Sequence, residues 1–179
     1  PVTLRGARPG DALVLTKPLG SGVVMAAEMR GLAPGAAVAA ALASMCRPQG
    51  DAARLLGGAH AMTDVTGFGL AGHLHGILMA SGCGARLDLA TLPLLAGAEA
   101  LARQGIRSSL YPQNRAAVPG LEAAQGARAD LLFDPQTAGG LLAAHPDGAA
   151  VVTALCAAGH DAAVIGQITD ARTGQITLV

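Results

Sequence analysis

The chain has 179 residues, of which 51% are hydrophobic and only 13% are charged. This length suits one hydrophobic core and is short for two, so we expect a single domain over residues 1–179. The 12 basic residues (Lys and Arg) balance the 12 acidic residues (Asp and Glu). The chain has no basic cluster of the kind that binds nucleic acids or anionic membranes. Because no apolar run reaches a bilayer span and no signal peptide opens the chain, we expect a soluble cytoplasmic protein.

The first half of the chain alternates strand-like and helix-like segments. After the turn signal Gly10-Asp11, the run 12–16 is expected to form a buried strand that breaks at the stretch KPLG. Glycine and proline signals delimit helices expected over residues 22–30, 36–45 and 51–56. The short segment 59–63 then leads into a glycine-rich motif, a helix over 69–80 with one apolar stripe, and a strand over 84–89.

The second half is harder to interpret, because periodicity is weak from Thr91 to Ala129 apart from one helix expected over 98–104. Strand-like segments at 131–133 and 141–144 flank the loop DPQTAGG, and a helix is expected over 148–158. The segments 163–168 and 175–179 are expected to form a terminal hairpin. Strands interleaved with helices predict an α/β (α+β) domain with a mixed sheet.

The motif TDVTGFGLAGHLHG, residues 63–76, allows three interpretations. Its glycines follow the G-x-G-x-x-G spacing of dinucleotide-binding loops, although the apolar segment before them is brief and interrupted. Alternatively, Asp64 at a strand end beside a helix start suits a hard cation that bridges phosphate oxygens, with Thr66, Gly67 and Gly69 in a phosphate-facing loop. The third interpretation is that Asp64 or Thr66 caps the helix while the glycines allow close packing.

The second motif, LLFDPQTAGGLL, centres on a turn. Pro135 fixes the turn after Asp134, and Gly139-Gly140 permits a close approach of backbone or ligand. Asp134 could contact a ligand or a partner domain, but the role of turn starter is favoured for it. Lys17, the single lysine of the chain, could bind phosphate as a point charge, although a solvated strand-end lysine is the commoner case.

Together the stretches GDALVLTKPLGSGVV, AMTDVTGFGLAGHL and LLFDPQTAGGLL resemble, in the same order, those of the selenophosphate synthetase family, also called selenide, water dikinases. The resemblance covers almost the whole chain and corresponds to the C-terminal half of that enzyme. It implies a three-layer domain with a mixed sheet flanked by helices, as in the aminoimidazole ribonucleotide synthetase-like superfamily. It also implies that an N-terminal half with the ATP-binding segment and the catalytic Cys or selenocysteine lies outside this chain, so we expect no catalytic residue here.

The resemblance further implies the chemistry. The family converts ATP, selenide and water to selenophosphate, AMP and phosphate, with Mg²⁺ and a monovalent cation such as K⁺, and its members form homodimers chiefly through the N-terminal half. The position of Asp64 is a magnesium ligand in that family. Ala138 stands where the family usually has serine. The alternatives are another ATP-dependent synthetase of the same superfamily and a non-catalytic nucleotide-binding module that binds NAD.

Overall fold

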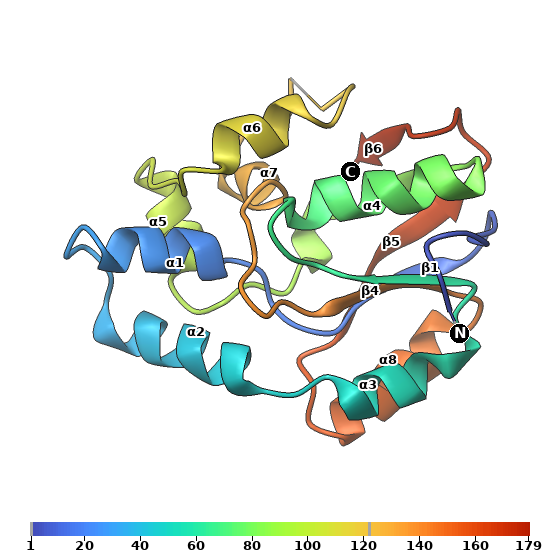
Figure 1. Ribbon diagram of the computed structural model, residues 1–179, viewed down its shortest axis with the longest axis horizontal. Coiled ribbons are helices and arrows are strands. Elements are labelled where there is room, and N and C mark those ends of the chain that lie inside the picture. Colours follow the sequence, from blue (N-terminus) through green and yellow to red (C-terminus); the bar gives the residue numbers. More distant parts are fainter. Residues whose placement is uncertain (1, 122) are drawn as a thin grey trace.

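The centre of the molecule is a mixed sheet, described for residues 2–121 and 123–179 in a computed structural model (Figure 1). Its strand order is β2-β4-β1-β5-β3-β6. All neighbouring strands run antiparallel except β3 and β6, which are parallel. The strands are β1 (Ala12–Leu15), β2 (Ala61–Asp64), β3 (Gly84–Leu87), β4 (Leu141–His145), β5 (Ala163–Thr169) and β6 (Ile176–Leu178).

Helices cover both faces of this sheet. The α-helices are α1 (Ser21–Glu28), α2 (Gly35–Cys46), α3 (Gly50–Leu55), α4 (Gly69–Ser81), α5 (Ala98–Arg103), α6 (Tyr111–Ala116), α7 (Ala127–Leu131) and α8 (Gly148–Ala157). Short 3₁₀ turns span Leu56–Gly58 and Leu89–Thr91. Within the described residues, every helix is too short or too polar to cross a bilayer.

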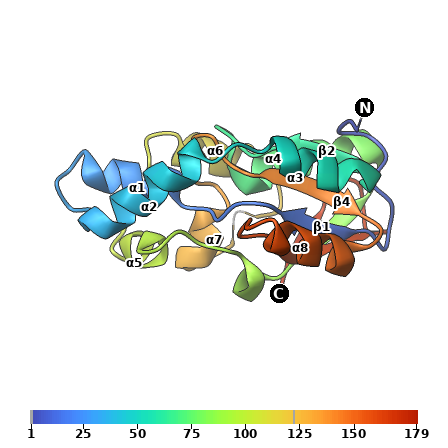
Figure 2. The same ribbon diagram turned by 90° about the horizontal axis from the view of Figure 1, so that it is seen from below.

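The alternation of side chains along β1 shows how the layers form. Leu13 and Leu15 belong to the core on the α4 side, whereas Val14 belongs to the core that α3 and α8 complete, because successive strand residues point to opposite faces. Figure 2 shows α4 and α8 on opposite sides of the strands. A further cluster joins α1, α2, α5 and α7 beside the sheet. The prediction of a mixed sheet flanked by helices is confirmed.

The expected strand at residues 131–133 is wrong. Residues 127–131 form α7, and the chain continues from it into a turn. Leu131, Leu132 and Phe133 are all buried. A short apolar run indicates burial but does not by itself distinguish a strand from the end of a helix. The helix α6 was also missed, since residues 91–129 show little apolar periodicity.

The expected terminal hairpin is wrong as well. β5 and β6 do not pair with each other; both pair with β3, which lies between them, β5 antiparallel and β6 parallel. The connection after β5 is anchored by the Gly174 N–H, which donates to the Cys83 carbonyl at 3.0 Å. Local alternation identifies a strand, but the choice of its neighbour depends on which backbone edges the rest of the sheet leaves unpaired.

Candidate functional site

The three sequence motifs meet at one end of the central strands (Figure 1). β1 and β2 both flank β4 in antiparallel register, so they end where β4 begins. The Val65 N–H donates to the Gly140 carbonyl at 2.8 Å, and the Thr16 N–H donates to the Leu141 carbonyl at 3.1 Å. We call this region the motif junction, and it comprises residues 16–22, 64–69 and 134–140.

The glycine pair of the second motif allows the backbones at the junction to touch. A Cβ on Gly139 would lie 2.1 Å from the Val65 carbonyl oxygen, and a Cβ on Gly140 would lie 2.6 Å from the Lys17 nitrogen. No side chain fits at such distances. The close approach expected from Gly139-Gly140 is therefore an approach of the protein's own backbone.

Lys17 is not the solvated strand-end lysine that was expected. Its side chain is buried, with 3% exposure, and Nζ donates to the Ser44 carbonyl at 2.7 Å and to the Ala138 carbonyl at 2.8 Å. Burial lowers the pKa of the ammonium, and the nearby Arg47 charge lowers it further. Lys17 thus ties the end of α2 to the DPQTAGG loop. Ala138 contributes its backbone carbonyl to this contact with Lys17, and its backbone has a left-handed φ of 47°.

Asp134 and Gln136 hold the start of α1. The Asp134 carboxylate accepts the Gly22 N–H at 3.0 Å, and Gln136 Oε1 accepts the N–H groups of Gly20 at 3.1 Å and Ser21 at 3.2 Å. They satisfy helix-start donors that the N-cap residue, a glycine, cannot serve. Burial raises the pKa of Asp134 to about 6, against the opposing effect of these hydrogen bonds.

The loop after β2 is held largely by internal hydrogen bonds. The Thr66 N–H donates to His73 Nε2 at 2.9 Å, which requires this nitrogen to be unprotonated, and burial lowers the pKa of His73 despite the nearby Asp64 charge. The Gly69 N–H donates to the Thr66 carbonyl at 3.1 Å. Gly69 has a left-handed φ of 71°, and a Cβ there would lie 2.8 Å from the Leu132 carbonyl oxygen. Gly69 therefore serves close packing.

Two donors of this loop stay available. Among the residues that the structure describes, the N–H groups of Gly67 and Phe68 have no protein acceptor. The first turn of α4 is less open, since the Ala71 N–H donates to the Leu132 carbonyl at 2.9 Å. An anion at this loop would therefore meet Gly67 and Phe68 first.

The dinucleotide-loop interpretation gains no support from the sheet. A dinucleotide site uses a strand, a helix and a parallel strand beside the first. Here β2 has the antiparallel β4 as its strand neighbour, and β3, the strand after α4, is fifth in the sheet order. Asp88, which follows β3, caps the turn after it by accepting the Ala90 N–H at 2.8 Å.

Asp64 lies at the end of β2 with an exposed side chain. In the described part of the chain, no hydrogen bond or ion pair engages its carboxylate, and no group of three or more His, Cys, Asp and Glu side chains could hold a metal ion. Mg²⁺ requires near-octahedral oxygen coordination. An exposed carboxylate of this kind can supply one oxygen ligand to such a cation but cannot complete its coordination shell.

The helix α6 supplies a site residue that sequence reasoning missed. Asn114 is buried, and its Nδ2 donates to the Gly67 carbonyl at 2.8 Å and to the Phe133 carbonyl at 3.0 Å. On the same helix, Tyr111 and Arg115 bind the Asp130 carboxylate at 2.5 Å and 3.1 Å. The i, i+3, i+4 spacing of these three residues was the signal that could have revealed the helix.

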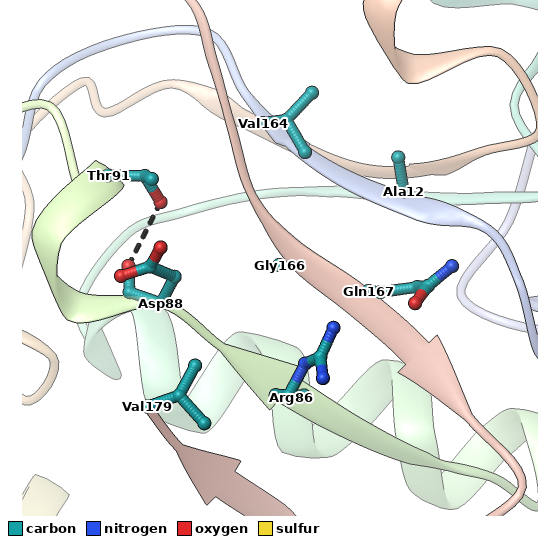
Figure 3. Close-up of a pocket in the computed structure, with 8 residues that line it drawn as sticks. All are labelled: Ala12, Arg86, Asp88, Thr91, Val164, Gly166, Gln167 and Val179. Carbon is teal, nitrogen blue, oxygen red and sulfur yellow. Dashed lines mark hydrogen bonds between the residues drawn. The ribbon is translucent and has the colours of Figure 1, made fainter.

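A hollow of about 360 Å³ lies on β3 and β5, apart from the junction. Figure 3 shows Arg86 and Gln167 side by side there on neighbouring strands, with Asp88 and Thr91 at one end. Its lining residues are Ala12, Arg86, Asp88, Thr91, Val164, Gly166, Gln167 and Val179. None of them belongs to the motif junction, so this hollow is not the candidate site.

The fold agrees with the comparisons. The family described as AIR synthase related protein, C-terminal domain, matches residues 8–179, so the chain belongs to that family. Escherichia coli HypE, a hydrogenase maturation protein, has a similar structure, with a TM-score of 0.71 at 19% identity over 99% of this chain and 48% of that one. A HypE structure in complex with ATP gives a TM-score of 0.65 at 18% identity, covering 99% and 49%. At these identities the likeness concerns the fold.

Relatives closer in sequence are selenide, water dikinases. The enzyme of Myxococcus xanthus is 40% identical over 97% of this chain and 52% of its own length, and that of Pelobacter propionicus is 39% identical over 94% and 51%. The resemblance to selenophosphate synthetases is thus confirmed. The chain spans about half the length of the curated relatives it matches.

Proposed function

We propose that this chain is the C-terminal domain of a selenophosphate synthetase, which converts ATP, selenide and water to selenophosphate, AMP and phosphate. The observation that carries the proposal is the exposed Asp64 carboxylate, which no described residue pairs, shortly before the N–H groups of Gly67 and Phe68, which find no acceptor in the same part of the chain. A carboxylate and free backbone donors on one loop suit a magnesium-bound polyphosphate. Relatives at 39–40% identity with this name support the choice of reaction.

In this proposal Asp64 contributes one ligand to Mg²⁺. The cation, when bound, neutralises the negative charge of the ATP phosphates. The loop at Gly67 and Phe68 offers N–H donors to phosphate oxygens, while Thr66 and Gly69 support the loop through His73 and Leu132. No residue of this chain is assigned the role of nucleophile or general base.

The remaining parts belong to the N-terminal half. That half would supply the other metal ligands, the ATP-binding segment and the Cys or selenocysteine, and it would form the homodimer contact. A monovalent cation such as K⁺ belongs to the same proposal. An exposed single carboxylate agrees with such a division, because a metal site built from two domains is completed only when they meet.

The test uses the protein with both halves present. Asp64→Asn removes the charge with little change in shape, and we expect it to lower selenide-dependent AMP formation about 100-fold, with partial recovery at high Mg²⁺. Asp170→Asn, the same change at an exposed carboxyl outside the junction, is the control and should retain activity. Wild-type turnover by Asp64→Asn would disprove the metal role, and ATP turnover that does not depend on selenide would disprove the choice of reaction.

A further inference from the structure

Asn114 links α6 to two of the three motifs. Its side chain is 6% exposed, and both N–H groups of its amide are directed at carbonyl oxygens, those of Gly67 and Phe133. These partners lie 47 and 19 residues away along the chain. A buried amide that donates one hydrogen bond to each of two loops restrains both of them.

The contact with Gly67 has a geometric consequence one residue later. The Gly67 carbonyl and the Phe68 N–H belong to the same peptide unit, which is planar, and in a trans peptide the two groups point in opposite directions. Asn114 holds the carbonyl toward the protein interior. The Phe68 N–H therefore points outward, in agreement with its lack of a protein acceptor among the described residues and with the 67% exposure of the Phe68 side chain.

Packing does not hold this peptide in place by itself. A Cβ added to Gly67 would meet nothing within 4 Å, in contrast to Gly69, which is packed against the Leu132 and Phe133 backbone. A glycine without such contacts can adopt more than one backbone conformation. The hydrogen bond from the Gly69 N–H to the Thr66 carbonyl closes a turn around this peptide, but such a turn can form with its central peptide facing either way. The hydrogen bond from Asn114 holds one of these orientations, and α6 itself is anchored because Tyr111 packs edge-on against Phe133, with ring centroids 6.1 Å apart.

We propose that Asn114 is a positioning residue that orients the Phe68 N–H toward an oxygen of the nucleotide phosphates. The proposal rests on the proposed function, which brings those phosphates to Asp64. The ligand class is a magnesium-bound nucleoside triphosphate. Asn114 acts through the Gly67-Phe68 peptide and does not touch the ligand.

The first experiment tests whether Asn114 holds the Gly67-Phe68 peptide in this chain without any ligand. Asn114→Asp keeps the shape but turns a donor toward carbonyl oxygens into an acceptor, and Gln113→Glu makes the same change at an exposed position of the same helix. We expect NMR relaxation to show a rigid Phe68 amide, with an order parameter of about 0.85, in the wild type and in Gln113→Glu. In Asn114→Asp it should fall below about 0.6. An unchanged value would overturn the positioning role. Asn114→Ser, which shortens the side chain without adding charge, replaces Asn114→Asp if that variant does not fold.

The second experiment measures steady-state kinetics of the protein with both halves. Loss of one oriented donor to a charged oxygen should raise the KM for magnesium-ATP about tenfold, with kcat within about twofold, and Gln113→Glu should match the wild type. If Phe68 loses its order while the KM stays unchanged, the ligand role of its N–H is overturned. Failure of the proposed function itself would be recognised separately, because Asp64→Asn would then retain full activity while the NMR result would stand.

Discussion

Polar side chains at the motif junction and at the hollow on β3 and β5 differ in their burial and in their hydrogen-bond partners. At the junction, Lys17, Asp134 and Gln136 are at most 5% exposed, and each binds backbone groups of another segment. At the hollow of Figure 3, Arg86 is exposed, and Asp88 accepts a hydrogen bond from a residue two positions later. At this hollow the contact with the backbone of a distant segment comes from Gln167, whose Nε2 donates to the Gly10 carbonyl at 3.2 Å, whereas the side chains of Arg86 and Asp88 tie no distant segment among the described residues.

This difference indicates which of the two regions has loops that are held in a fixed conformation. Burying a charge is costly unless hydrogen bonds compensate for it. The junction contains a buried ammonium and a buried carboxyl, and both are engaged in holding loops against each other. A hollow by itself marks space for a ligand, whereas compensated buried charges mark loops whose shape is maintained, so the junction is the better candidate site.

The largest effect is expected where the junction backbones touch. Gly139→Ala would place a methyl group 2.1 Å from the Val65 carbonyl oxygen. Because a backbone cannot yield as a flexible side chain does, we expect the free energy of unfolding to fall by about 3 kcal/mol, measured by urea denaturation. Gly76→Ala, within α4 with open space around the added group, should instead stabilise by about 0.5–1 kcal/mol. Equal effects of the two changes would contradict the tight contact.

The next effect is a pH dependence that originates in Asp134. Its pKa is raised from 3.8 to about 6 by burial, which corresponds to roughly 3 kcal/mol against the ionised form. Between these values the folded state binds more protons than the unfolded state, so stability should decline as the pH rises from about 4 to 6 and level off above it. Denaturation at a series of pH values should show this decline in the wild type and in Asp170→Asn. A decline of the same size in Asp134→Asn would contradict the assignment.

The smallest effect is expected at the hollow. The Arg86 side chain is exposed and makes no hydrogen bond or ion pair with the described residues. Arg86→Ala should therefore change the free energy of unfolding by less than about 0.5 kcal/mol and leave magnesium-ATP kinetics unchanged in the protein with both halves. A loss of activity comparable to that of Asp64→Asn would reverse the comparison and make the hollow the functional site.

Local signals were sufficient for most elements. The strand β1, the helices from α1 to α5, and α8 match their expected segments to within a few residues, because apolar periodicity and glycine or proline boundaries act over short distances. The resemblance to selenophosphate synthetases likewise rested on three contiguous stretches of sequence. Asp64 could be singled out from the sequence because a strand end before a helix is a local feature, whereas its preference as a metal ligand over a helix cap came from the resemblance and stays a prediction.

The sequence by itself therefore determined the mixed α/β class, the location of the motifs and the family resemblance. Only the tertiary structure decided that β3 lies between β5 and β6, that Lys17 is buried, and that Asn114 holds Gly67. The physical reason is that these features depend on which unsatisfied backbone groups meet across long sequence separations. A residue's own neighbours along the chain do not contain that information.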